Sequence, residues 1–260
     1  KLDDLRLQRL LAPSAAGAWV PPSRPSASLH SVAVPDEAAP EGAAGQAWSV
    51  AVHRKRFENA ILAVAAALRE AEPKLTELDS VVGDGDIGIS LARGARAVEE
   101  LAPSLDLDRP AAALRDLSAN LRKVLGGTSG PLYAVFVLRA ATALAEARDP
   151  GDPKAWAAAF RAGCDAMQAL GGAKAGDRTM LDALLPAAHA IEQAVGEGGD
   201  VSTILRSAIE ASDAGVEATK DMRPRLGRSA YVGERALGNP DPGAYAVSVW
   251  LKAIASAVQG

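Results

Sequence analysis

The sequence predicts an all-α protein, a bundle or barrel of eight antiparallel helices, and three observations support this prediction. Alanine provides 57 of the 260 residues, and alanine is the best helix former and a poor strand former. From about residue 49, apolar residues recur with the helical period of i, i+3, i+4 and i+7. Glycine and proline separate these stretches by short connections, which favour antiparallel neighbours. No segment has a convincing strand pattern.

The predicted helices follow one another along the chain. The first shows its buried face in Phe57, Ile61, Val64, Ala65 and Leu68. The same spacing recurs from Trp156 to Leu170 and again from Val201 to Val216. The eight expected helices are residues 49–72, 87–102, 110–125, 129–148, 153–170, 178–196, 200–219 and 242–258.

The first 48 residues have a different composition. Residues 2–11 form a short amphipathic segment, and six of the sixteen prolines then lie between Pro13 and Gly45, among alanine, serine and glycine. Such a segment has too few apolar side chains to fold by itself. We therefore expect residues 1–12 to be the remnant of a preceding domain, 13–48 to be a linker, and 49–260 to be a helical domain.

Composition excludes several classes of protein. The net charge of −4 argues against a nucleic-acid binder, which usually needs a basic face. A single cysteine, Cys164, excludes an internal disulfide and a cysteine-based zinc site, and its place on an apolar helix face suggests a core residue. The sequence has no apolar run long enough to span a membrane, and its first eleven residues mix charges with leucines and lack the apolar core of a signal peptide. We expect a cytoplasmic protein that binds neither nucleic acid nor membrane.

Four loops rich in glycine, aspartate and serine stand out between the predicted helices. They are residues 78–90, 126–130, 171–179 and 227–243. They follow the first, third, fifth and seventh predicted helices. Because alternate connections of an antiparallel bundle lie at the same end, all four are expected to meet there and form the functional site.

The first loop holds three carboxylates within eight residues, Asp79, Asp84 and Asp86. Like charges this close need a cation between them, and Mg²⁺ prefers such oxygen ligands while keeping positions open for phosphate. The alternative is that Asp84 and Asp86 only cap the next helix. Gly83, Gly85 and Gly88 match the dinucleotide fingerprint, but that fingerprint needs a preceding strand, which this chain does not offer.

The other three loops suggest a site for an anion and a nucleoside. Thr128 and Ser129 open a helix after two glycines, which is an anion site or merely a well-capped helix start. The loop at 171–180 is suited to packing flat against a base or ribose, with Met180 as an apolar contact; the alternative is a helix C-cap followed by an Asp177 N-cap. In the last loop, Arg228 is placed to neutralise phosphate, and Asp241 could accept a hydrogen bond from a nucleotide hydroxyl or amine. The alternative is that Asp241 belongs to a plain helix-capping turn.

Taken together, the motifs resemble a known family, the nucleotide-binding (L) domain or subunit of dihydroxyacetone kinases, over roughly residues 50–258. The motifs, in order, are Leu78-Asp79-x4-Asp84-Gly85-Asp86-x-Gly88, Gly126-Gly127-x-Ser129-Gly130-Pro131, Gly176-Asp177-x-Thr179-Met180, Gly227-Arg228-x-x-Tyr231-x-Gly233-Glu234-Arg235 and Asp241-Pro242-Gly243-Ala244. The resemblance implies an eight-helix barrel that holds ATP or ADP at one end. It also implies two Mg²⁺ ions bound by Asp79, Asp84 and Asp86.

The nucleotide contacts that the resemblance implies are Gly88, Ser90, Thr128, Ser129, Gly171, Met180, Arg228, Asp241, Pro242 and Gly243. It implies no catalytic residue beyond this metal and phosphate site. Many members have histidine and asparagine where this chain has Ile87 and Ser90. The chain therefore departs from the family pattern beside the third aspartate.

The start of the chain, Leu5–Pro13 followed by Trp19, resembles the end of the substrate-binding (K) domain of single-chain, ATP-dependent members. The resemblance implies that this chain is the C-terminal part of a kinase. Such a kinase phosphorylates dihydroxyacetone or a similar short ketose that the K domain holds, so activity would require the K domain. One alternative is a phosphotransferase-system subunit whose bound ADP is rephosphorylated by a phosphocarrier protein. Another is a non-catalytic, nucleotide-bound regulator.

Overall fold

The structure is a computed structural model that describes residues 51–226, 228–231 and 233–259, without the side chains of Ala51, Val52 and Arg228. The expected domain remnant at 1–12 and the expected linker at 13–48 lie outside the described residues.

The described part of the chain is all-α, as predicted, and contains no strand. The helices are α2 (Ala51–Glu70), α3 (Glu72–Val82), α4 (Ile87–Leu101), α5 (Pro110–Val124), α6 (Ser129–Glu146), α7 (Pro153–Gly171), α8 (Leu181–Gly196), α9 (Val201–Ala218) and α10 (Pro242–Gln259). Short 3-10 turns are η1 (Ala102–Ser104), η2 (Thr219–Asp221), η3 (Arg228–Tyr231) and η4 (Gly233–Ala236). None of these helices is long and apolar enough to cross a membrane.

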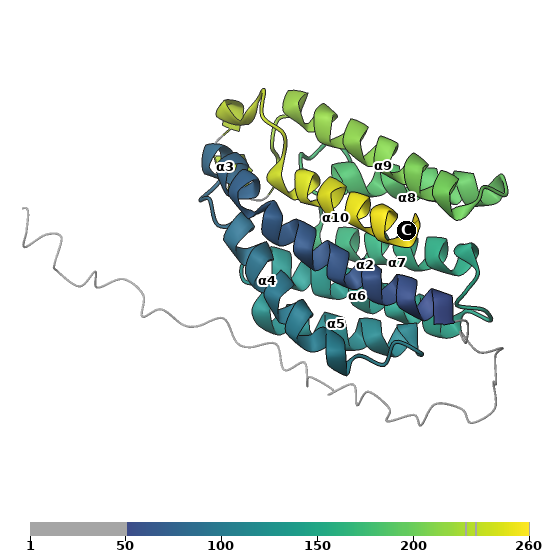
Figure 1. The fold of residues 1–260 in the computed structure, drawn as a ribbon. Coiled ribbons are helices and arrows are strands. Elements are labelled where there is room, and N and C mark those ends of the chain that lie inside the picture. The colour runs from purple at the N-terminus through teal and green to yellow at the C-terminus, as the bar shows by residue number, and fades with distance from the viewer. Residues whose placement is uncertain (1–50, 227, 232, 260) are drawn as a thin grey trace, which may run out of the picture. The chain divides into compact units, whose positions relative to one another are not determined.

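Eight of the helices form a closed ring. Each packs against the next in the order α2, α4, α5, α6, α7, α8, α9 and α10, and α10 returns to pack against α2 (Figure 1). The eight-helix barrel predicted from the sequence is therefore confirmed. Helix α3 is not part of this ring. It lies at the end of the barrel where the chain passes from α2 to α4.

The presence of α3 corrects the prediction for residues 72–90. The sequence predicted one helix over 49–72 and a loop from residue 78, whereas α2 ends at Glu70 and α3 runs from Glu72 to Val82. Pro73 ends the first helix as expected, but it also starts the second, because a proline in the first turn lacks only an N–H that needs no partner there. The aspartate-rich loop is therefore only the four residues from Gly83 to Asp86.

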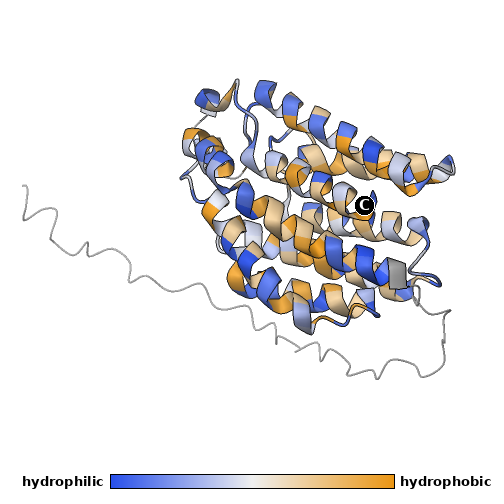
Figure 2. Cartoon of the chain, viewed as in Figure 1, coloured by the Kyte–Doolittle hydropathy of each residue, from blue (hydrophilic) through white to orange (hydrophobic). Residues whose placement is uncertain are grey.

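Small residues allow the barrel helices to approach closely. A β-carbon at Gly163 of α7 would lie within 2.9 Å of the carbonyl oxygen of Phe136 on α6. Phe136 also meets Phe160 edge-on at 5.5 Å between ring centroids, and Trp250 at 6.2 Å. In Figure 2 hydrophobic and hydrophilic residues alternate along outer helices such as α9, as expected for amphipathic helices with one buried face.

The inside of the barrel is apolar. It contains a cavity of about 470 Å³ whose walls are almost entirely apolar side chains, including Leu68, Phe136 and Trp250. Cys164 is fully buried, and burial raises the pKa of its thiol to about 12. The prediction of Cys164 as a core residue is therefore confirmed.

Candidate functional site

A second cavity, also of about 470 Å³, lies where the four glycine-rich loops meet. Residues from all four loops line it, so the prediction that these loops share one end of the barrel is confirmed. The expected site residues that line it are Asp79, Asp84, Asp86, Ser90, Thr128, Ser129, Gly171, Met180, Asp241, Pro242 and Gly243.

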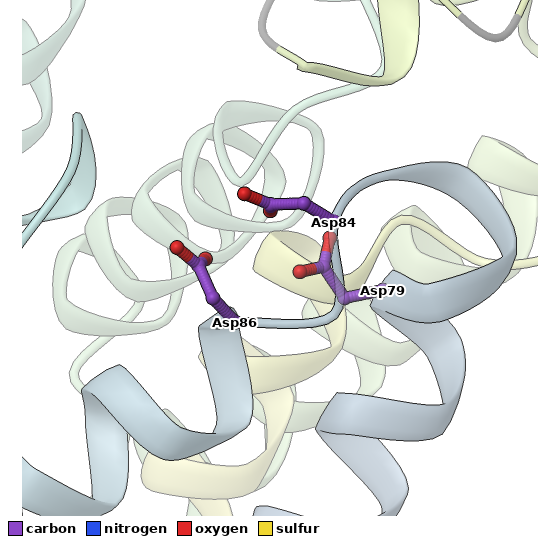
Figure 3. Close-up of side chains that lie close together, drawn as sticks. All are labelled: Asp79, Asp84 and Asp86. Atoms are coloured by element: carbon purple, nitrogen blue, oxygen red, sulfur yellow. The ribbon is translucent and has the colours of Figure 1, made fainter.

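Three carboxylates meet at this cavity (Figure 3). Asp79 comes from the last turn of α3, Asp84 from the loop, and Asp86 from the residue before α4. One oxygen of each lies within 4.8 Å of the others. Asp79 is buried, whereas Asp84 and Asp86 are exposed. Asp79 is thus held by a helix rather than by the flexible loop that the sequence suggested.

Glycines make the tight loop between α3 and α4 possible. A β-carbon at Gly83 would collide with Oδ1 of Asp79. Gly85 has a φ of 76°, a left-handed conformation that favours glycine. The loop brings the N–H of Ile87 to Oδ2 of Asp79 at 3.2 Å. The two glycines therefore allow the chain to turn back so that Asp84 and Asp86 face Asp79.

The capping alternative does not account for Asp86. Asp86 occupies the N-cap position of α4, but its side chain makes no capping hydrogen bond to that helix within the described residues. The N–H of Ile87, the first residue of α4, donates to Asp79 from the preceding helix. Asp86 therefore lies in the group of three carboxylates without serving as the side-chain cap of α4.

The start of α6 presents polar groups to the same cavity. Gly127 has a φ of 64°, and Thr128 is the N-cap residue, yet its hydroxyl forms no capping bond in the part of the chain that the structure describes. Thr128 and Ser129 both line the cavity. The well-capped alternative for Thr128 is therefore wrong. The first N–H groups of a helix, with two hydroxyls beside them, are an arrangement that favours an anion.

For the loop between α7 and α8, the capping alternative is right for the end of α7 and wrong for the start of α8. Gly172, with a φ of 68°, ends α7 as a left-handed C-cap, as the alternative interpretation predicted. Asp177 is not an N-cap, because α8 begins only at Leu181; its carboxylate accepts from the N–H of Lys174 at 2.8 Å. Met180 and Gly171 line the cavity beside apolar Leu170 and Leu132, which suits an aromatic base.

Asp241 lines the cavity and also caps α10. Its Oδ2 accepts from the N–H of Ala244 at 2.9 Å, and its own N–H donates to Oγ1 of Thr219 at 2.8 Å. Burial raises the pKa of Asp241 to about 6, an effect that nearby Asp182 reinforces and that Arg178 only partly offsets. The closest guanidinium nitrogen of Arg178 lies 3.8 Å from Oδ1 of Asp241.

This raised pKa predicts that replacing Asp241 by asparagine has a pH-dependent effect on stability. Because the folded carboxyl holds its proton up to about pH 6, its contribution to the free energy of unfolding is full below pH 4 and is lost as pH rises through 6. The free energy of unfolding of the unmodified chain should therefore fall relative to that of Asp241→Asn, by up to about 3 kcal/mol between pH 4 and 8. Urea unfolding of both proteins across this range measures it, and a constant difference would contradict the burial of a titrating carboxyl.

Two expected contacts are not placed at the cavity. Gly88 is absent from the lining among the described residues; it packs against α3, where a β-carbon would collide with Thr76 and with the carbonyl oxygen of Glu72. A glycine is needed at this position for the close packing of α4 against α3. The spacing of Gly83, Gly85 and Gly88 in the sequence did not reveal this. The side chain of Arg228 is outside what the structure describes.

Arg178 lines the cavity but was not predicted from the sequence to be a site residue. It stands between Asp177 and Thr179 in a loop that looks polar and exposed. Its side chain is nevertheless fully buried. No spacing or composition signal marks such a residue, because its partners come from a distant loop.

Sequence comparisons identify the relatives of this chain. The profile of the DAK2 domain matches residues 81–256. A putative 3,4-dihydroxy-2-butanone kinase of Solanum lycopersicum is 36% identical over 100% of this chain and 45% of its own length. The triokinase/FMN cyclase of Homo sapiens is 37% identical over 99% of this chain and 44% of its own length. The chain thus spans less than half the length of these relatives.

Two further proteins resemble about three quarters of the chain. The ADP-binding subunit DhaL of the PEP-dependent dihydroxyacetone kinase of Escherichia coli is 33% identical over 71% of this chain and 88% of its own length. The crystal structure of the dihydroxyacetone kinase of C. freundii superposes with a TM-score of 0.63 at 32% identity, over 77% of this chain and 34% of that one. Motifs, fold and sequence similarity agree: the chain belongs to the dihydroxyacetone kinase family, as a DAK2 domain with the all-α fold of the nucleotide-binding L domain.

Proposed function

We propose that this chain is the ATP-binding domain of a kinase that transfers the γ-phosphoryl group to dihydroxyacetone or a similar short ketose held by a separate domain. The observation that supports it most is the meeting of three carboxylates with the open N-terminus of α6 in one cavity. Carboxylates repel a bare phosphate, whereas a helix N-terminus attracts it. A metal–phosphate complex satisfies both.

The donor set suits Mg²⁺. All three ligands are carboxylate oxygens, which this hard cation prefers, and their separation of at most 4.8 Å is of the order expected around ions with oxygen distances of about 2.1 Å. The structure of the C. freundii kinase in complex with AMP-PNP and Mg²⁺, which superposes with a TM-score of 0.62, supports both the nucleotide and the metal. Following the family resemblance, we assign two ions to Asp79, Asp84 and Asp86.

Each loop then has a role in positioning the nucleotide. Bound Mg²⁺ would neutralise charge on the β- and γ-phosphates. The N–H groups of α6, with Thr128 and Ser129, orient the phosphate oxygens, and Arg228 is assigned to the same task. The apolar wall near Met180 holds the base, opposite the turn at 241–243. Phosphoryl transfer needs little else from the protein than such positioning and charge stabilisation.

The acceptor is assigned to a separate substrate-binding domain. Relatives that match the whole chain, including residues 1–50, are more than twice as long as their matched part. This supports an arrangement in which residues 13–48 tether the helical domain to a K domain. Relatives are named for dihydroxyacetone, 3,4-dihydroxy-2-butanone and D-erythrulose, so the substrate class proposed here is a short ketose.

The second candidate function is that of an ADP-holding subunit rephosphorylated by a phosphocarrier protein. It is favoured by the match to the E. coli ADP-binding subunit over 88% of that protein. In this case ADP stays bound through the cycle, whereas an ATP-dependent kinase exchanges it. Extensive dialysis of the nucleotide-loaded chain distinguishes them, since only the phosphocarrier-dependent subunit would retain ADP.

Complementation tests the proposed function. The chain mixed with the purified K domain of a relative is expected to convert ATP and dihydroxyacetone to ADP and dihydroxyacetone phosphate in equal amounts. A coupled assay with glycerol-3-phosphate dehydrogenase measures the dihydroxyacetone phosphate that is formed. Omission of either protein serves as the control. Nucleotide binding without any transfer, with several K domains that are active with their own partners, would contradict the kinase assignment.

A further inference from the structure

Arg178 links two loops of the cavity wall that lie far apart in the sequence. Its Nη2 donates to the carbonyl oxygen of Ala236 at 3.2 Å and to that of Asn239 at 2.9 Å. Arg178 belongs to the loop between α7 and α8, whereas its two acceptors precede α10. The side chain has an exposed fraction of 0%, so water does not compete for these bonds. The guanidinium therefore joins the loop at 171–180 to the turn at 236–243.

The backbone of Arg178 is strained in a way that favours this link. Its φ of 62° is the one positive φ of a non-glycine residue in the described ranges. An L-residue adopts this conformation only where its surroundings impose it, and such residues cluster at binding sites. Here Asp182 imposes it, because its carboxylate accepts from the N–H groups of Gly176 and Thr179, on either side of Arg178.

The link is incomplete in this structure. Nε and Nη1 of Arg178 are buried without a hydrogen-bond acceptor among the described residues. The carboxylate of Asp241 faces Nη1 but at 3.8 Å, beyond hydrogen-bond distance. A guanidinium normally donates from several nitrogens at once. A shift of the Asp241 turn toward Arg178 would supply the missing acceptor.

We propose that Arg178 is a positioning residue for the nucleotide: it holds the two loops at the spacing that the nucleoside needs, and nucleotide binding closes Asp241 onto it. This inference rests on the proposed function, since it concerns the same cavity. The geometry supports it directly, because Met180 follows Arg178 by two residues and its β-carbon lies 3.4 Å from where a β-carbon of Gly243 would be. Opening the link would move these two wall residues apart.

Arg178→Lys tests the geometry of the link at constant charge. Lysine keeps the positive charge beside Asp241 and the same backbone strain, but it loses the planar fork with separate nitrogens for the carbonyls and for Asp241. We expect the affinity for Mg-ADP, measured by calorimetry well below the melting temperature, to fall by about tenfold or more. Mn²⁺ binding without nucleotide, measured by electron paramagnetic resonance, should change less than about twofold, because the three aspartates lie at the end of α3 and in the loop that follows it, outside the two loops that Arg178 joins.

The control is Arg223→Lys. Arg223 pairs with Glu234 at 2.8 Å, with 74% of its side chain exposed, and its replacement should leave the affinity for Mg-ADP unchanged within about twofold. Failure of the unmodified chain to bind Mg-ADP would overturn the proposed function. Equal affinity of the unmodified chain and folded Arg178→Lys would overturn only the role of Arg178.

Hydrogen exchange on the unmodified chain keeps the inference testable if Arg178→Lys does not fold. One link that fastens two loops makes them open together. Amides at 172–176 and 237–239 should therefore show similar protection, and Mg-ADP should slow exchange in both by a similar factor. Protection by Mg-ADP in only one of the two loops would overturn the proposal.

Discussion

Replacing Asp86 by asparagine is expected to abolish Mg²⁺-dependent nucleotide binding while the helical fold is kept. The substitution removes one anionic oxygen from a set of three that lie within 4.8 Å. Changing a group that merely orients a metal ligand costs about 10- to 100-fold in metal affinity, so the loss of a ligand itself should cost at least that. Because one like charge is also removed, repulsion between the carboxylates falls and the folded chain should be no less stable.

The same result is expected for Asp84→Asn, and Asp116→Asn is the matched control. Asp116 is exposed on α5 and does not line the cavity. Calorimetry with Mg-ATP gives the affinity of each variant, and circular dichroism reports its helix content. Unchanged affinity in Asp84→Asn and Asp86→Asn would show that these aspartates only shape the loop.

The second large effect concerns turnover: the isolated chain is expected to bind Mg-ATP but not to phosphorylate dihydroxyacetone at a useful rate. Holding an acceptor in line with the γ-phosphate is worth roughly 7–11 kcal/mol of the barrier. The groups that line the cavity are assigned to a metal and a nucleotide, and the acceptor is assigned to another domain. Slow hydrolysis of ATP is the activity that should remain.

A coupled assay on the purified chain, with and without an added K domain, measures this effect. The rate with dihydroxyacetone alone should equal the rate of ATP hydrolysis without it. Stoichiometric formation of dihydroxyacetone phosphate by the chain alone would show that an acceptor site exists within these 260 residues.

The fold was predictable because it depends on patterns that repeat along the chain. The spacing of Phe57, Ile61 and Leu68 shows a helix without knowledge of its neighbours, and eight such stretches with short connections lead to an antiparallel barrel. The one missed helix, α3, is short and has a proline as its second residue. Its apolar Leu75, Leu78 and Val82 are buried, but three residues are too few to distinguish a helix from a loop by periodicity alone.

The site was predictable where its residues are close in sequence and chemically unusual. Asp79, Asp84 and Asp86 fall within eight residues of one sequence motif, and the structure brings their carboxylates together. Arg178 was missed because its acceptors are carbonyl groups 58 and 61 residues further along the chain. Backbone acceptors leave no trace in a sequence. Gly88 was assigned to the nucleotide because a glycine required for close helix packing looks the same as one required by a ligand.

The central claim is that the aspartate triad and the start of α6 form one site for a metal–nucleotide complex. Its most direct test is calorimetric titration of ADP into the 260-residue chain, once with saturating Mg²⁺ and once with EDTA. We predict binding of one ADP per chain with Mg²⁺, and an affinity lower by at least about tenfold with EDTA. Equal affinity in the two titrations, or no binding in either, would contradict the account.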